Sequence, residues 1–214
     1  MNKGLFGCLA VGGVLLVGVI FFVLMAMGMY NSLVEKAQAV DKQWAQVQNV
    51  YQRRVDLVPN LVASVSGAAT FEKSTLVEVT QARSWVARAA IPAGQAPTDP
   101  AQLQAFEQAQ GQLASALSRL LVVVEKYPEL KANQNFLDLQ AQLEGTENRI
   151  SVERGRFNDV VQTYNTSVKK FPTMLVAGMM GFSPRPYFTA TPGAETPPKV
   201  EFNFNSPTPA PAAP

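Results

Sequence analysis

Five glutamates in the second half of the chain have the residue type and spacing that could do chemistry. Bundles of helices can hold a di-iron centre between carboxylates on facing helices. Such a centre also needs Glu-x-x-His motifs, and the chain contains no histidine. We therefore expect ordinary solvated carboxylates, no metal site and no cofactor at these positions: Glu125, Glu129, Glu144, Glu147 and Glu153.

Residue types also exclude the other common catalytic arrangements. Without histidine the chain has no Ser-His-Asp or Cys-His triad. The single cysteine, Cys8, allows neither an internal disulfide nor a cysteine-ligated zinc. Gly111 and Gly145 stand alone, so no glycine-rich phosphate loop is present. An enzyme that uses only Ser, Lys or Asp stays open, but no pattern points to one, and we expect no enzymatic activity.

The charge pattern limits the partners. Net charge is +2, and no run of lysines or arginines exceeds two residues. A nucleic-acid partner usually needs a concentrated basic face, so we expect none. No small-molecule substrate is evident either.

Residues 4–29 form 26 consecutive positions without a charged side chain. As a helix this stretch spans roughly 39 Å, enough to cross a hydrocarbon core of about 30 Å with some tilt. It is too long for a cleaved signal peptide, so we predict an uncleaved single-pass membrane anchor after a short segment, residues 1–3. The lipid bilayer is then the first expected partner.

Apolar side chains recur in alternating steps of three and four after the anchor, which indicates packed helices. The pattern predicts helices over residues 30–55, 60–89, 100–127 and 129–171, joined by short connections. The fold class is therefore all-α, with the anchor followed by an antiparallel up-and-down four-helix bundle. Polar residues at bundle-facing positions (Gln110, Glu153 and Arg83) are expected to pair with one another or lie at the edges, and a polar cavity is the alternative.

Three features of the connections and the C-terminal part complete this organisation. Around Pro59 both a turn and a kink are open, and we prefer a turn. The apolar residues 174–180 are too short to span a bilayer, and we expect them to close the open end of the bundle rather than contact the membrane surface. Residues 189–214 are rich in Pro, Ala and Thr and are predicted to be a disordered tail, with a strand-like pattern at residues 200–204.

Several motifs follow one another in order: residues 30–34, 52–62, 130–136, 143–150, 164–165, 171–173 and 181–188. On these motifs residues 30–188 resemble the LemA family of bacterial membrane proteins. The resemblance implies one N-terminal membrane helix and a four-helix domain, with no agreed catalytic residue. It also implies a bacterial inner-membrane protein with its bundle in the cytoplasm. The excess of Lys and Arg after the span points to the same side.

Candidate interaction or structural residues lie in three of these motifs. Arg53, Arg54 and Asp56 are predicted to form an ion cluster around a turn at Pro59 and Asn60. Asn133 and Asn135 are expected to satisfy backbone groups at the start of the last long helix. The third motif is predicted to be a strap folded over the bundle, with a docking peptide as the alternative: Phe182, Pro184, Arg185, Pro186, Tyr187 and Phe188.

The sequence therefore predicts a membrane-anchored, non-catalytic scaffold or adaptor that binds a protein partner or a second copy of itself. Two alternatives stay open. One is an accessory subunit of a membrane enzyme, such as a peptide-processing system, and the other is a membrane-shaping oligomer.

Overall fold

A computed structural model of the protein describes residues 3–66 and 72–189. All regular secondary structure within these two ranges is helical, which confirms the all-α prediction there. The elements are α1 (Lys3–Ser66), α2 (Lys73–Arg88), α3 (Pro100–Val124), α4 (Pro128–Lys131), α5 (Gln134–Lys169) and α6 (Thr173–Met180).

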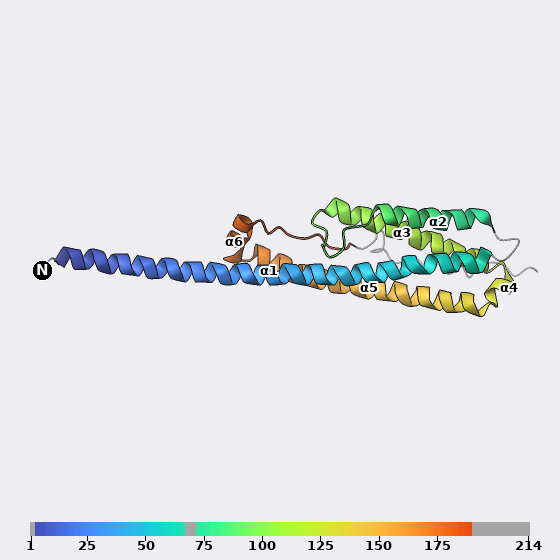
Figure 1. Ribbon diagram of the computed structural model, residues 1–214, viewed down its shortest axis with the longest axis horizontal. Helices are drawn as coiled ribbons and strands as arrows, with labels where there is room; N and C mark the ends of the chain where they lie inside the picture. The colour runs from blue at the N-terminus through green and yellow to red at the C-terminus, as the bar shows by residue number, and fades with distance from the viewer. Residues whose placement is uncertain (1–2, 67–71, 190–214) are drawn as a thin grey trace, which may run out of the picture.

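Helix α1 has two parts with different surroundings. Residues 11–25 are exposed along their whole length, and this part is long and apolar enough to cross a membrane. Figure 1 shows it extending well past the other helices. From Leu33 onward the predicted apolar positions turn inward, and Val40, Trp44 and Val47 have no exposed surface. One continuous helix therefore joins the apolar segment to the packed domain.

The predicted turn at Pro59 is wrong, because α1 runs through this proline to Ser66. A proline inside a helix costs about 3 kcal/mol, chiefly through a lost hydrogen bond and a ring clash. Here the proline ring is exposed, while Val58, Leu61 and Val65 on the inner face are buried. Each buried aliphatic side chain contributes about 1.5–3 kcal/mol, so packing outweighs the proline penalty. The second helix accordingly begins at Lys73 and not at residue 60.

Four helices pack side by side along the domain. The C-terminal part of α1 lies against α5, and α2 lies against α3. Following the colours in Figure 1, successive long helices run in alternating directions, α1 toward the right, α2 back, α3 forward and α5 back. The core has two clusters of buried residues. A membrane-distal cluster contains Leu61 and Leu113, and a proximal cluster contains Leu33, Trp44 and Phe157.

Local capping sets where two helices begin. The Asp99 side chain accepts a hydrogen bond from the N–H of Ala101, with Pro100 as the first helical residue of α3. Asn133 caps α5 by accepting from the N–H groups of Asn135 and Phe136, which confirms its predicted role. Asn135 contributes its backbone N–H. The predicted helix over residues 129–171 is therefore divided into the short α4 and the long α5.

The expectation for residues 174–180 is wrong for most of their side chains. They form α6, and Ala177 is the one residue of this helix that is buried in the core. Met179 is 84% exposed and Leu175 is 55% exposed, so the outer side of α6 faces away from the domain, while its inner side packs against α1 and α5. The predicted tail after Thr189, including residues 200–204, lies outside the described residues.

Candidate functional site

Arg54 is a buried cation at the centre of a polar cluster between α1, α3 and α5. Its Nη1 donates to Glu147 Oε1 at 2.7 Å, and the two groups form an ion pair. Its Nη2 donates to Gln110 Oε1 at 2.5 Å and to the Gln110 carbonyl oxygen at 3.1 Å. The guanidinium also lies over the ring of Tyr51, 5.2 Å from the centroid. These contacts tie three helices together at one level of the core.

The predicted ion cluster around Pro59 is wrong. Arg54 points into the core, whereas Arg53 and Asp56 are exposed, and Asp56 accepts a hydrogen bond from Gln52 at 2.7 Å. Pro59 and Asn60 are exposed as well. Helix geometry explains the separation, because neighbouring residues point about 100° apart around a helix and cannot all face one partner.

The polar residues predicted at bundle-facing positions do not pair with one another. Gln110 is buried and bonds Arg54. Glu153 accepts hydrogen bonds from Gln43 and Arg156, at the edge of the interface. Arg83 is exposed, so its predicted position on the inner face of α2 is wrong.

Residues 182–189, called the strap below, lie in an extended conformation across the helices (Figure 1). Two asparagines of α5 hold the strap by its backbone. Asn158 accepts from the N–H of Phe188 and donates to its carbonyl oxygen, both at 2.9 Å. Asn165 makes the same two bonds with Arg185, at 2.8 and 2.9 Å. Each asparagine thus satisfies both backbone groups of one strap residue.

Phe188 anchors the strap in the proximal core cluster. Its ring stacks on Trp44 with centroids 6.0 Å apart and meets Phe157 edge-on at 5.4 Å. The Arg154 guanidinium covers the ring, 4.7 Å from its centroid, and also donates to Glu107 and to the carbonyl oxygen of Thr189. The Phe188 side chain is therefore buried between α1 and α5.

The remaining strap residues differ in their contacts. Arg185 Nη1 donates to the carbonyl oxygen of Ala96, 2.7 Å away, and so reaches the loop between α2 and α3. The Tyr164 hydroxyl donates to the carbonyl oxygen of Ser183 at 3.0 Å. Phe182 meets Tyr30 of α1 edge-on, with ring centroids 5.8 Å apart. Pro184 and Tyr187 are exposed, and Pro186 is half-buried.

Sequence reasoning did not select Asn158 and Asn165 as functional residues. A signal for them exists, because within α5 an aromatic residue followed by asparagine occurs twice, seven residues apart, at Phe157–Asn158 and at Tyr164–Asn165. Seven residues are about two helical turns, so the two pairs share one face. The repeat marks the face on which the strap lies.

Burial raises the pKa of three groups near these contacts. It raises the pKa of the Tyr51 and Tyr164 phenols, although nearby arginines act in the opposite direction. Burial likewise raises the pKa of the Glu107 carboxyl, against the attraction of Arg154. These groups are held by core packing and are not arranged as an acid and a base around an open site. Within the described residues no group of three or more His, Cys, Asp or Glu side chains lies close enough to hold a metal ion.

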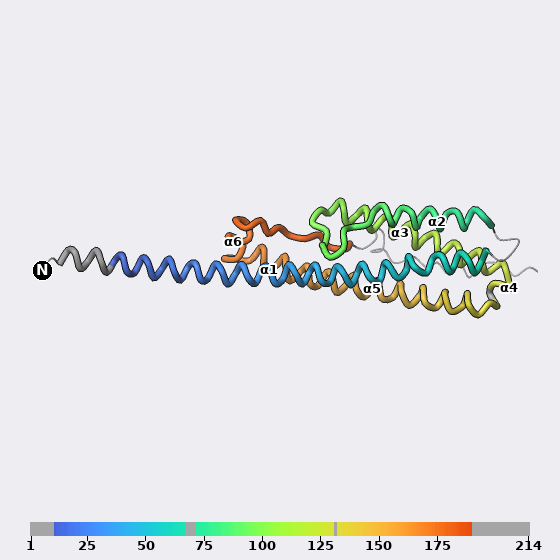
Figure 2. Tube along the Cα trace, in the orientation of Figure 1, coloured from blue at the N-terminus to red at the C-terminus, as the bar shows by residue number. Residues whose placement is uncertain are grey.

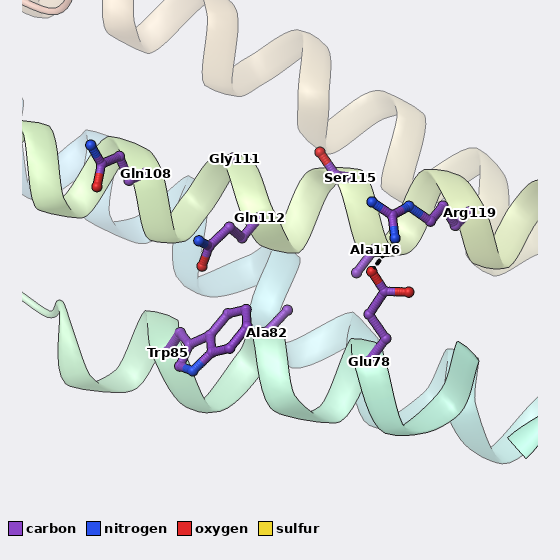
Figure 3. A pocket seen from close by; sticks show the side chains of 9 residues that line it. All are labelled: Glu78, Ala82, Trp85, Gln108, Gly111, Gln112, Ser115, Ala116 and Arg119. Atoms are coloured by element: carbon purple, nitrogen blue, oxygen red, sulfur yellow. Dashed lines mark hydrogen bonds and ion pairs between the residues drawn. The ribbon is translucent and has the colours of Figure 1, made fainter. Parts of the chain in front are cut away.

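An open groove of about 510 Å³ lies between α2 and α3. Figure 3 shows Trp85 and Gln112 facing each other across it, with the ion pair between Glu78 and Arg119 at one end. A side chain at Gly111 would meet no atom within 4 Å, so the groove wall is open there. Its lining mixes apolar and polar side chains, as protein interfaces do.

The sequence is similar to those of several known proteins. The LemA family model matches residues 43–202. Magnetosome protein MamQ of Magnetospirillum gryphiswaldense is 28% identical over 208 residues, covering 88% of this chain and 74% of the relative. Magnetosome protein MamQ 2 of Paramagnetospirillum magneticum is 26% identical over 198 residues, covering 84% and 71%. Protein LemA of Metamycoplasma hominis is 25% identical over 164 residues, covering 77% and 69%.

Proposed function

Because the chain belongs to the LemA family, we propose that it is a membrane-anchored, non-catalytic scaffold that presents its helical domain to a protein partner. One observation carries the proposal: α1 continues from the exposed apolar segment into both core clusters of the domain. The domain cannot rotate about α1 without breaking this core. The anchor therefore sets which faces of the domain point sideways, along the membrane surface.

The groove between α2 and α3 is the proposed docking surface. In Figure 1 α2 lies on the opposite side of the domain from α5, and no strap residue lines the groove, so a partner can approach it without displacing the strap. Its walls combine Trp85, a common anchor in protein interfaces, with an exposed ion pair that can set the orientation of a partner. The small residues Gly111 and Ala82 leave room for an incoming side chain.

The polar clusters support a non-catalytic role. Arg54 and Arg154, beside Phe188, make their contacts with neighbouring helices of the domain. Neither side chain is placed beside a nucleophile in an open pocket. The names of the MamQ relatives refer to a cellular structure and not to a reaction. We place the domain on the cytoplasmic side of a bacterial inner membrane, in line with the excess of Lys and Arg after the span.

Photocrosslinking in living cells tests the scaffold. A photoreactive amino acid is placed in the full chain at Gln112 in the groove, at Asn60 on α1, at Tyr187 in the strap, or at Val152 on the exposed face of α5. We expect a light-dependent adduct with one protein from Gln112 and not from Val152, identified by mass spectrometry. The absence of any adduct from all four positions overturns the scaffold. An adduct with a membrane enzyme supports the accessory-subunit alternative, and an adduct with a second copy supports the membrane-shaping oligomer.

A further inference from the structure

Helix α6, together with Phe171 in the connection before it, carries exposed apolar side chains that do not pack in the core of the domain. Met179 is 84% exposed, and Phe171 is 72% exposed. Exposed apolar side chains that are contiguous mark interaction surfaces in folded proteins. The exposed members of this surface, called the α6 patch below, are Phe171, Met174, Leu175, Met179 and Met180.

The α6 patch lies where the apolar segment of α1 ends. Figures 1 and 2 show α6 beside α1 at the point where α1 leaves the packed domain. Ala177 of α6 belongs to the same buried cluster as Leu33, and Phe182 just after α6 meets Tyr30. Tyr30 follows directly on the uncharged residues 4–29, and Leu33 lies three residues further along α1. If residues 4–29 cross the bilayer, α6 lies at the level of its surface.

Charge near the patch favours a membrane with anionic lipids. Lys169 and Lys170 are exposed immediately before the patch. Residues 160–189 contain no Asp or Glu, and their charged side chains are Lys169, Lys170 and Arg185. Apolar side chains flanked by lysines are typical of segments that bind at a membrane interface. Each lysine near an anionic surface contributes about 1 kcal/mol to such binding.

We infer that α6 is a second, interfacial membrane contact, with the α6 patch inserted at the boundary between headgroups and acyl chains of an anionic bilayer. Eight residues of helix measure about 12 Å, too short to span, so α6 lies along the surface. A second copy of the chain is a poorer occupant, because a stable protein interface buries about 800 Å² per partner and involves 20–30 residues. Together with α1, this contact fixes the tilt of the domain over the membrane. The inference does not depend on any protein partner.

Depth-dependent quenching of a fluorophore tests the contact in the full chain. Cys8 is replaced by serine, and single cysteines introduced as Leu175→Cys or Met179→Cys are labelled with an environment-sensitive dye. The control is Val122→Cys, whose exposure of 66% lies between those of Leu175 and Met179 but which is on α3. Each protein is reconstituted in vesicles of phosphatidylcholine with or without phosphatidylglycerol, containing lipids spin-labelled near the headgroup. We expect the lipid label to quench positions 175 and 179 at least three-fold more than position 122.

The outcomes separate the occupants of the patch. Equal lipid quenching at positions 175, 179 and 122 overturns the inference. Another outcome is a dye at position 175 that is shielded from water without being quenched by the lipid label. If that shielding rises with protein density in the membrane, the inference is overturned and a second copy covers the patch. Replacing Lys169 and Lys170 by glutamine should reduce quenching in phosphatidylglycerol vesicles and leave it unchanged in pure phosphatidylcholine. Loss of quenching in both lipids, or in neither, contradicts the role of charge.

Discussion

Asn165 and Arg185 form a reciprocal pair in which one side-chain amide satisfies both backbone groups of the other residue. The Asn165 Oδ1 accepts from the N–H of Arg185 at 2.8 Å, and its Nδ2 donates to the Arg185 carbonyl oxygen at 2.9 Å. Asn158 repeats this arrangement with Phe188, three residues further along the strap. No strand lies beside the extended strap among residues 3–66 and 72–189, so these asparagines supply the bonds that a sheet would otherwise provide.

Replacing Asn158 by leucine should release the end of the strap without unfolding the domain. Two hydrogen bonds of about 1 kcal/mol each are lost, so local opening should become roughly 30-fold more frequent. Hydrogen exchange measured by mass spectrometry on the full chain in detergent should show faster exchange of the Phe188 amide. Asn165→Leu should have the same effect at Arg185.

Asn148→Leu provides the matched control for the strap variants, because Asn148 lies exposed on the same helix. It should leave exchange of the strap amides unchanged. The strap would not depend on these bonds if Asn158→Leu and Asn148→Leu gave the same exchange at Phe188.

The helices and their buried faces could be predicted from the spacing of apolar residues in the sequence. Leu103, Leu113 and Leu120 on α3 are buried as their spacing indicates, because one face of that helix meets the rest of the core. On α5 the buried side chains near the C-terminal end include Val161 and Val168, whereas Val160 and Ser167 are only half-buried. The strap contacts this end of α5, and a contact between residues about 20–30 positions apart is not encoded in local periodicity.

Local rules failed where tertiary packing opposed them. A proline predicts a helix break from its missing N–H, but the inner face around Pro59 buries enough apolar surface to keep α1 intact. The sequence places Arg54 between charged neighbours, and this pattern predicted a surface ion cluster. Its buried partners, Gln110 and Glu147, lie on distant parts of the chain, and only the fold brings them to it.

Removing the Arg54 side chain should destabilise the protein strongly. Arg54→Ala leaves Gln110 buried without its partner and opens a cavity, so the free energy of unfolding should fall by about 3–5 kcal/mol. Urea unfolding of the full chain in detergent, followed by tryptophan fluorescence, measures this change. The exposed neighbour provides a control, and Arg53→Ala should change stability by less than about 0.5 kcal/mol.

Replacing both polar partners should be milder than removing one. The double variant Arg54→Met with Gln110→Met contains apolar side chains of similar length and leaves neither group unsatisfied. It should recover most of the stability that Arg54→Ala loses. If the double variant were as unstable as Arg54→Ala, the hydrogen bonds themselves, and not the unsatisfied groups, would account for the loss.

Pro59→Ala should stabilise the protein. The exposed ring contributes little packing, and alanine restores the N–H that can bond to the carbonyl of Val55. We expect the free energy of unfolding to rise by about 1–3 kcal/mol in the same urea assay. Ala63→Pro, four residues further along α1, is the opposite change and should destabilise the protein. A loss of stability in Pro59→Ala would mean that the proline favours a helix shape that packing requires.

Glu107 should make the protein more stable as the pH falls toward about 4.5. Burial raises the pKa of its carboxyl in the folded state above the ordinary value of 4.5, so the folded protein binds this proton more tightly than the unfolded chain. Between these two pKa values the contribution of Glu107 to stability therefore rises on acidification. At neutral pH the charged carboxylate carries a desolvation cost that Arg154, 2.8 Å away, offsets only in part.

Glu107→Gln isolates this contribution because it removes the ionisation and retains an oxygen that can accept from Arg154. The variant should be at least as stable as the natural protein at pH 7, and the difference between them should shrink as the pH approaches 4.5. Urea unfolding at a series of pH values measures the difference, in which the other carboxylates cancel. Glu78→Gln, which removes a carboxylate from an exposed arginine pair, reports the effect of surface charge alone. The opposite result would be a natural protein that is more stable than Glu107→Gln at pH 7 and loses this advantage on acidification. It would show that the attraction of Arg154 outweighs the desolvation cost of burying the Glu107 carboxylate.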